Sequence, residues 1–95
     1  MEDLADFNRG LEAIKKAITA ALWQEGVKET SVSSTTHGSA RIPHSVSVQV
    51  VANGRTVTEA FTKNEVLDAA TGVDQMSVAS RIRGIAARIA ARPRR

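Results

Sequence analysis

The 95-residue chain contains no cysteine and only three aromatic residues, Phe7, Trp23 and Phe61. The absence of cysteine excludes disulfide bridges, thiolate metal sites and a cysteine nucleophile. With so few aromatic side chains, a hydrophobic core has to be built from valine, isoleucine, leucine and alanine. Such a core is light, and self-association is a common way for a small protein to bury more surface.

Long hydrophobic runs are also missing. The longest apolar segment, residues 17–23, is too short to cross a bilayer. The chain begins Met-Glu-Asp-Leu-Ala-Asp, whose negative charge is wrong for the n-region of a secretory signal. Together with the lack of cysteine, these features lead us to expect a soluble, intracellular, cytoplasmic protein with no membrane partner.

Positive charge is concentrated at the C-terminal end. The formal net charge is +3, yet residues 1–30 hold six acids against four bases, and residues 31–80 hold four acids against three bases. Residues 81–95 hold six arginines and no acid. The basic character is therefore a property of this last segment and not of the whole surface.

An amphipathic helix is predicted over residues 3–24. Large apolar side chains recur there at spacings of three and four, which places them in one stripe on a helix. The stripe consists of Leu4, Phe7, Leu11, Ile14, Ile18 and Leu22. Gly26 is a natural C-terminal stop, whereas Gly10 inside the helix costs about 1 kcal/mol relative to alanine. A helix of roughly 30 Å is long for so small a domain, which makes the stripe a candidate for pairing with a second copy.

The clearest local pattern is SVSVQVVANGRTVTEAFT, residues 45–62. Alternating valines before and after an Asn-Gly dipeptide predict a β-hairpin with a two-residue type I′ turn. In that register Val50 faces Val57, and Glu59 falls on the inner face opposite Val48. The apolar members of that inner face are Val46, Val48, Val50, Val57 and Phe61. A carboxylate among them needs a partner or a place at the sheet margin.

The remaining segments are less uniform. Residues 28–36 are rich in serine and threonine with Val32 as the sole apolar member, so an edge strand and a loop both stay open. Residues 37–45 contain a glycine and a proline and predict a loop. A capping-box sequence, Thr-Lys-Asn-Glu, begins a short helix over residues 63–70. A last helix over residues 75–91 has an apolar stripe formed by Val78, Ile82, Ile85 and Ile89.

This order of elements predicts an α+β fold. We expect a long N-terminal helix, a small antiparallel sheet of two or three strands built on the β-hairpin, and two C-terminal helices packed on one sheet face. We expect residues 1–92 to form a single small domain, followed by residues 93–95 as a basic C-terminal tail.

Few residues offer catalytic chemistry. His37 and His44 flank a polar loop without a neighbouring carboxylate, which falls short of the three or four ligands of a metal site. Glu59 is the one carboxylate whose expected surroundings raise its pKa, but a salt bridge at the sheet margin is the simpler role. Isolated glycines in turns form no phosphate-binding loop. We therefore expect no enzymatic activity, no cofactor, no metal and no small-molecule substrate.

Three interpretations compete for the arginines that flank the last apolar stripe. Their aliphatic stems can cover the core edge while their heads pair with acids of the first helix, namely Glu2, Asp3, Asp6 or Glu12. They can instead contact phosphates in a salt-sensitive manner. A helix lying on an anionic membrane is the third interpretation, and the lack of aromatic residues disfavours it. The candidate polyanion-binding residues are Arg81, Arg88, Arg92, Arg94 and Arg95.

Taken together, the sequence predicts a non-catalytic protein-interaction or assembly module that self-associates, with a homodimer or another protein as its complex. The candidate self-association surface is the stripe from Leu4 to Leu22. The alternative is nucleic-acid (polyanion) binding through the arginine-rich C-terminal helix. As the recognition helix of a helix-turn-helix, that segment would present Gln75, Ser77 and Ser80 to the bases.

Overall fold

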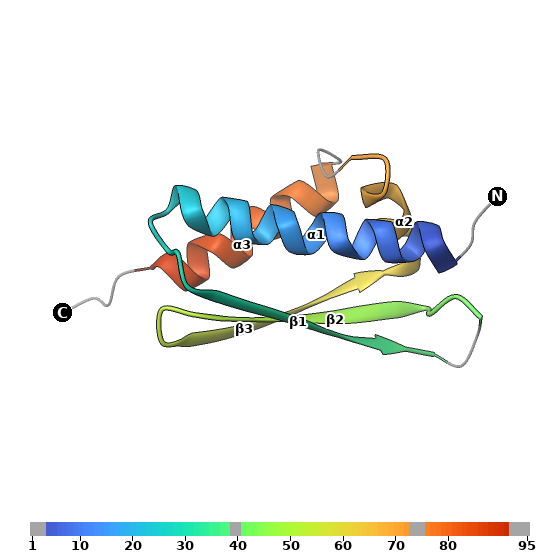
Figure 1. Ribbon diagram of the computed structural model, residues 1–95, viewed down its shortest axis with the longest axis horizontal. Helices are drawn as coiled ribbons and strands as arrows, with labels where there is room; N and C mark the ends of the chain where they lie inside the picture. Colours follow the sequence, from blue (N-terminus) through green and yellow to red (C-terminus); the bar gives the residue numbers. More distant parts are fainter. Residues whose placement is uncertain (1–3, 39–40, 73–75, 92–95) are drawn as a thin grey trace.

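A computed structural model describes residues 4–38, 41–72 and 76–91 of the chain. The elements are α1 (Leu4–Gln24), β1 (Thr30–His37), β2 (Ser45–Ala52), β3 (Arg55–Thr62), α2 (Lys63–Ala69) and α3 (Met76–Ala90). The strands form one antiparallel sheet in the order β1-β2-β3, and the helices lie together on one side of it (Figure 1). The predicted α+β fold is confirmed. Among the described helices, none has the length and apolar character that a membrane crossing requires.

The hairpin of β2 and β3 has the predicted register. Val50 lies opposite Val57, and Glu59 lies opposite Val48. The two residues of the Asn-Gly turn have φ angles of 55° and 72°, the left-handed values that a type I′ turn requires. Because a two-residue turn determines which residues face each other next to it, the pairing of the whole hairpin follows from this dipeptide.

Residues 30–37 form a third strand, the alternative that the sequence left open. β1 runs antiparallel to β2, from Thr30 opposite Ala52 to His37 opposite Ser45. Val32 packs against the core but is only partly buried. The strand therefore lacks the alternation of apolar and polar residues by which a half-buried strand is recognised.

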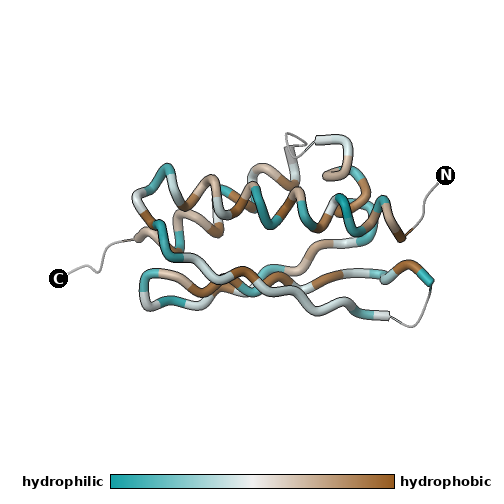
Figure 2. The backbone as a smooth tube through the Cα atoms, viewed as in Figure 1, coloured by the Kyte–Doolittle hydropathy of each residue, from teal (hydrophilic) through white to brown (hydrophobic). Residues whose placement is uncertain are grey.

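The core lies between the helices and the inner face of the sheet, with apolar positions recurring along both layers (Figure 2). Its large side chains are Phe7, Leu11, Ile14, Ile18, Leu22, Val46, Val48, Val50, Phe61, Val66, Val78, Ile82, Ile85 and Ile89. Most of them are isoleucine, leucine or valine, as the scarcity of aromatic residues requires. α1 runs along the long axis of the molecule, whose extents are 49 × 24 × 19 Å (Figure 1). The length of α1 is thus accommodated by an elongated molecule.

Gly10 lies where α1 and α2 come closest. A Cβ atom at this position would be 1.7 Å from the backbone oxygen of Val66 in α2. The two helices therefore approach to backbone contact, which only glycine permits here. The loss of helix propensity at this residue is offset by the close packing of α2 on α1.

Candidate protein-interaction site

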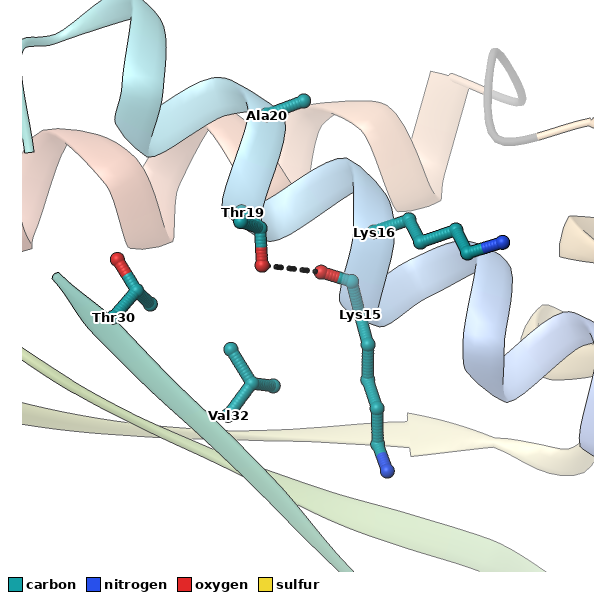
Figure 3. Close-up of a pocket in the computed structure, with 6 residues that line it drawn as sticks. All are labelled: Lys15, Lys16, Thr19, Ala20, Thr30 and Val32. Atoms are coloured by element: carbon teal, nitrogen blue, oxygen red, sulfur yellow. Dashed lines mark hydrogen bonds between the residues drawn. The ribbon is translucent and has the colours of Figure 1, made fainter. Parts of the chain in front are cut away.

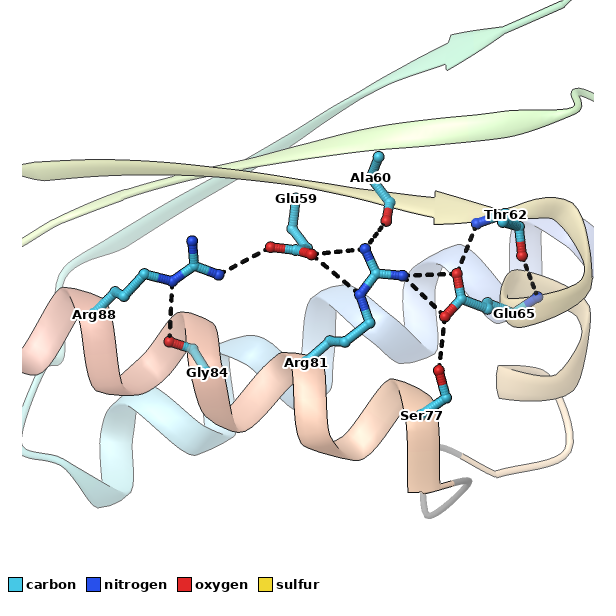
Figure 4. A network of polar contacts seen from close by, with 8 residues as sticks. All are labelled: Glu59, Ala60, Thr62, Glu65, Ser77, Arg81, Gly84 and Arg88. Carbon is cyan, nitrogen blue, oxygen red and sulfur yellow. Dashed lines mark hydrogen bonds and ion pairs between the residues drawn. The ribbon is translucent and has the colours of Figure 1, made fainter.

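The outer edge of β3 is covered by α3. From α3, Arg81 donates through Nε and Nη2 to Oε1 of Glu59 on β3, at 3.1 and 2.6 Å. Its Nη1 donates to Oε1 of Glu65 in α2 at 2.7 Å (Figure 4). Nη2 also donates to the backbone carbonyl of Ala60. The guanidinium carbon lies 4.7 Å from the centre of the Phe61 ring, so Arg81 contacts the edge through charge, hydrogen bonds and its planar face.

The carbonyl of Ala60 is one of the groups that an edge strand leaves unpaired. In an antiparallel ladder, alternate residues direct their N–H and C=O groups at the neighbouring strand. The backbone hydrogen bond from Lys63 N to His44 O, 2.9 Å long, shows which residues of β2 and β3 form the hydrogen-bonded pairs. In the same register, the backbone N–H and C=O groups of Phe61, Glu59 and every second residue point at β2. Those of Ala60 point outward, away from the sheet. Arg81 therefore occupies a backbone group that another strand would otherwise use.

Further contacts hold α3 against this edge. Arg88 Nη2 donates to Oε2 of Glu59 at 2.9 Å, so two arginines share one carboxylate. From the hairpin, Asn53 Nδ2 donates to the carbonyl of Ile89 at 3.0 Å. Arg55 Nη1 donates to the carbonyl of Arg88 at 2.9 Å. The hairpin thereby satisfies carbonyls in the last turn of α3 that have no partner within the helix.

The carboxylates of this network are held in their charged form. Hydrogen bonds from Arg81 lower the pKa of Glu59 and prevail over burial, which raises it; Arg88 adds to the lowering. Burial raises the pKa of Glu65, but the backbone N–H of Thr62 and the guanidinium of Arg81 reverse this, and the pKa is lowered overall. The suggestion that the surroundings of Glu59 raise its pKa is therefore wrong, and the salt bridge at the sheet margin is confirmed.

The predicted arginine site is only partly described. The side chain of Arg81 is 29% exposed and that of Arg88 is 56% exposed, and both are paired with carboxylates. Their carboxylate partners among the described residues are Glu59 and Glu65, because α3 lies beside β3. Glu2 and Asp3 of the first helix lie outside the described residues. The other candidates, Arg92, Arg94 and Arg95, lie outside the described residues.

The three residues predicted to contact bases do not form one exposed set in the described structure. Ser77 Oγ donates to Oε2 of Glu65 at 3.0 Å, so it takes part in the network beside β3. Ser80 is exposed, and Gln75 lies outside the described part of the chain.

The predicted self-association stripe on α1 is packed inside the molecule. Leu11 is 8% exposed, and four members are fully buried: Phe7, Ile14, Ile18 and Leu22. Leu4 differs from the rest because 43% of it is exposed. The stripe thus forms the core of its own chain.

The edge of β1 lacks the cover that β3 has. Val32 and Ser34 lie opposite Val50 and Val48, which direct their backbone groups at β3, so the backbone groups of Val32 and Ser34 face outward. The same holds for every second residue of the strand. Within the described residues, no side chain hydrogen-bonds to these outward groups. β1 also contains no aspartate, glutamate, lysine, arginine or proline, and its ladder with β2 has no bulge; these are the usual protections of an exposed edge.

A groove of about 460 Å³ runs beside this open edge, between α1 and β1 (Figure 3). It is lined by Lys15, Lys16, Thr19, Ala20, Thr30 and Val32. Thr19 Oγ1 donates to the Lys15 carbonyl at 3.1 Å, whereas the buried Oγ1 of Thr30 has no hydrogen-bond partner in the described part of the chain. A buried hydroxyl without a partner costs free energy, and a segment lying in the groove would relieve that cost.

His37 and Glu59 lie on opposite faces of the sheet. His37 Nε2 lies 2.8 Å from Oγ of Ser47, and both side chains are on the sheet face that the helices leave open. Glu59 is on the opposite face, against α3. Among the described residues there is no group of three side chains able to hold a metal ion. His37 and Glu59 therefore do not share a pocket.

The fold and its two unlike edges define a small α+β protein: Arg81 from α3 bonds the β3 edge at Ala60, and no described side chain bonds the outward groups of β1. The chain matches no model of a known protein family, no curated protein and no solved structure. Function is therefore argued from the site, because a fold by itself does not identify an activity.

Proposed function

We propose that the protein is a non-catalytic interaction and assembly module that works by strand addition at the β1 edge. A partner segment in extended conformation pairs with β1 and enlarges the sheet. The observation that carries this proposal is the difference between the two edges. Arg81 occupies an outward carbonyl of β3, whereas the outward groups of β1 have no partner among the described residues.

The groove beside β1 supports this mode of binding. In strand addition the main chain provides affinity, and pockets for alternate side chains provide specificity. Val32 and Thr30 direct their side chains into the groove, and Lys15 and Lys16 lie on its α1 side. An added strand would therefore place every second side chain between β1 and α1.

Polyanion binding has weaker support. Arg81 and Arg88 share the carboxylate of Glu59, which reduces the positive potential that phosphates would meet. Ser77 is hydrogen-bonded to Glu65 and is not free to contact a base. The described residues therefore favour strand addition over nucleic-acid recognition.

Strand addition is tested by NMR titration with ten-residue peptides of alternating valine and threonine, flanked by neutral, acidic or basic residues. We expect amide shift changes at residues 30–36 and around Lys15 and Thr19, without changes in β3. S34P removes one outward N–H and abolishes the response, whereas S34A at the same position preserves it. No response at millimolar peptide, or changes centred on β3 and α3, would overturn the proposal.

A further inference from the structure

The chemistry of the open edge indicates what kind of segment pairs with it. β1 has the sequence TSVSSTTH and contains no aspartate, glutamate, lysine or arginine; His37 is its last residue. Beside it, α1 presents Lys15 and Lys16, and the charged groups of Lys15 and Glu12 lie 3.9 Å apart. A strand of this composition has no strong preference for a partner of one charge, and within the strands themselves self-pairing opposes no two lysines, arginines or carboxylates.

Resting on the proposed function, we infer that the partner segment is β1 of a second copy of this chain. The two strands pair antiparallel across a two-fold axis, and two three-stranded sheets become one sheet of six strands. This uses the same surface on both copies and leaves the covered β3 edges at the two ends of the new sheet.

The backbone phase restricts the register of this pairing. Only even-numbered residues of β1 direct their N–H and C=O groups outward, so even residues of the two copies exchange hydrogen bonds. A register centred on Ser33 pairs Val32 with Ser34 of the second copy. It also pairs Thr30 with Thr36, so the hydroxyl of Thr36 becomes available to the unpartnered Oγ1 of Thr30.

The test introduces a charge at Ser33, whose exposed side chain lies on the sheet face without helices. In the proposed dimer, Ser33 of one copy lies next to Ser33 of the other copy at the two-fold axis. S33K and S33D each place like charges together in the dimer, so sedimentation equilibrium at low salt should show association at least about tenfold weaker than wild type. An equimolar mixture of S33K and S33D should restore it. T58K is the matched control, because Thr58 lies in the same cross-strand row but on β3, and it should leave association unchanged.

The outcomes separate this inference from the proposed function. If wild type is monomeric at several hundred micromolar, or if S33K and T58K weaken association equally, the pairing of β1 with a second β1 is wrong. The peptide titration is then repeated on S33K, in which a β1-paired dimer cannot block the β1 edge. A response at residues 30–36 in S33K keeps strand addition as the function, and its absence removes that function as well.

Discussion

Two helical glycines of this protein have opposite environments. Gly10 in α1 is pressed against the backbone of Val66, whereas a Cβ at Gly84 in α3 would meet no atom within 4 Å. Both positions carry the same intrinsic penalty in a helix, about 1 kcal/mol relative to alanine. The sequence shows that penalty at both positions, but only the packing of α2 tells which glycine is required.

Replacing each glycine by alanine should therefore change stability in opposite directions. G10A forces α1 and α2 apart and should lower the free energy of unfolding by about 2 kcal/mol, because overpacking exceeds the gain in propensity. G84A adds a methyl group in open space and should raise it by about 0.5–1 kcal/mol. Urea unfolding followed by circular dichroism measures both. A stable G10A protein would contradict the close crossing of α1 and α2.

The elements differ in how much of them the sequence predicts. The β2–β3 register follows from the Asn-Gly turn and the alternating valines, which are local features. β1 is not predictable in this way, because Val32 is its single residue packed against the core. The strand is held in the sheet by its backbone hydrogen bonds with β2. The partners of Arg81 are also invisible in the sequence, since Glu59 and Glu65 come near it only when α3 lies beside β3.

The ion-pair network on β3 predicts a dependence of stability on acid. The pKa values of Glu59 and Glu65 are lowered in the folded protein, below the value of about 4.3 for an unfolded glutamate. The unfolded chain therefore binds protons first, and the stabilisation is complete above about pH 4.3 and is lost as the pH falls through the lowered values. Melting temperatures measured from pH 7 to pH 2.5 should therefore decrease once the pH is below about 4.3.

A variant separates the network from other acid effects. E59Q removes one charge that Arg81 and Arg88 share, and we expect about 1–3 kcal/mol less stability at pH 7, between the values for exposed and buried pairs. Its further loss on acidification should be smaller than that of wild type. Parallel pH curves for the two proteins would show that Glu59 does not contribute in the predicted way.

Across the whole molecule, the two edges of the sheet differ. Helices cover its inner face, and Arg81 from α3 donates to the outward carbonyl of Ala60 in β3, whereas no described side chain hydrogen-bonds to the outward groups of β1. The strands follow one another roughly along the shortest axis of 19 Å, down which Figure 1 is viewed. Association through β1 therefore widens the molecule along this axis, whereas contacts at its ends would lengthen the 49 Å axis.

Small-angle X-ray scattering distinguishes these geometries. In a β1-paired dimer the two β2 strands are three strand spacings, about 14 Å, apart. The radius of gyration should then rise only from 13.5 Å to about 15 Å while the mass doubles. Two copies joined end to end along the 49 Å axis would exceed about 20 Å. A doubled mass with a radius near this larger value would place the contact at the ends of the molecule and not at β1. S33K should return both mass and radius to the monomer values, because it removes the side-by-side pairing itself.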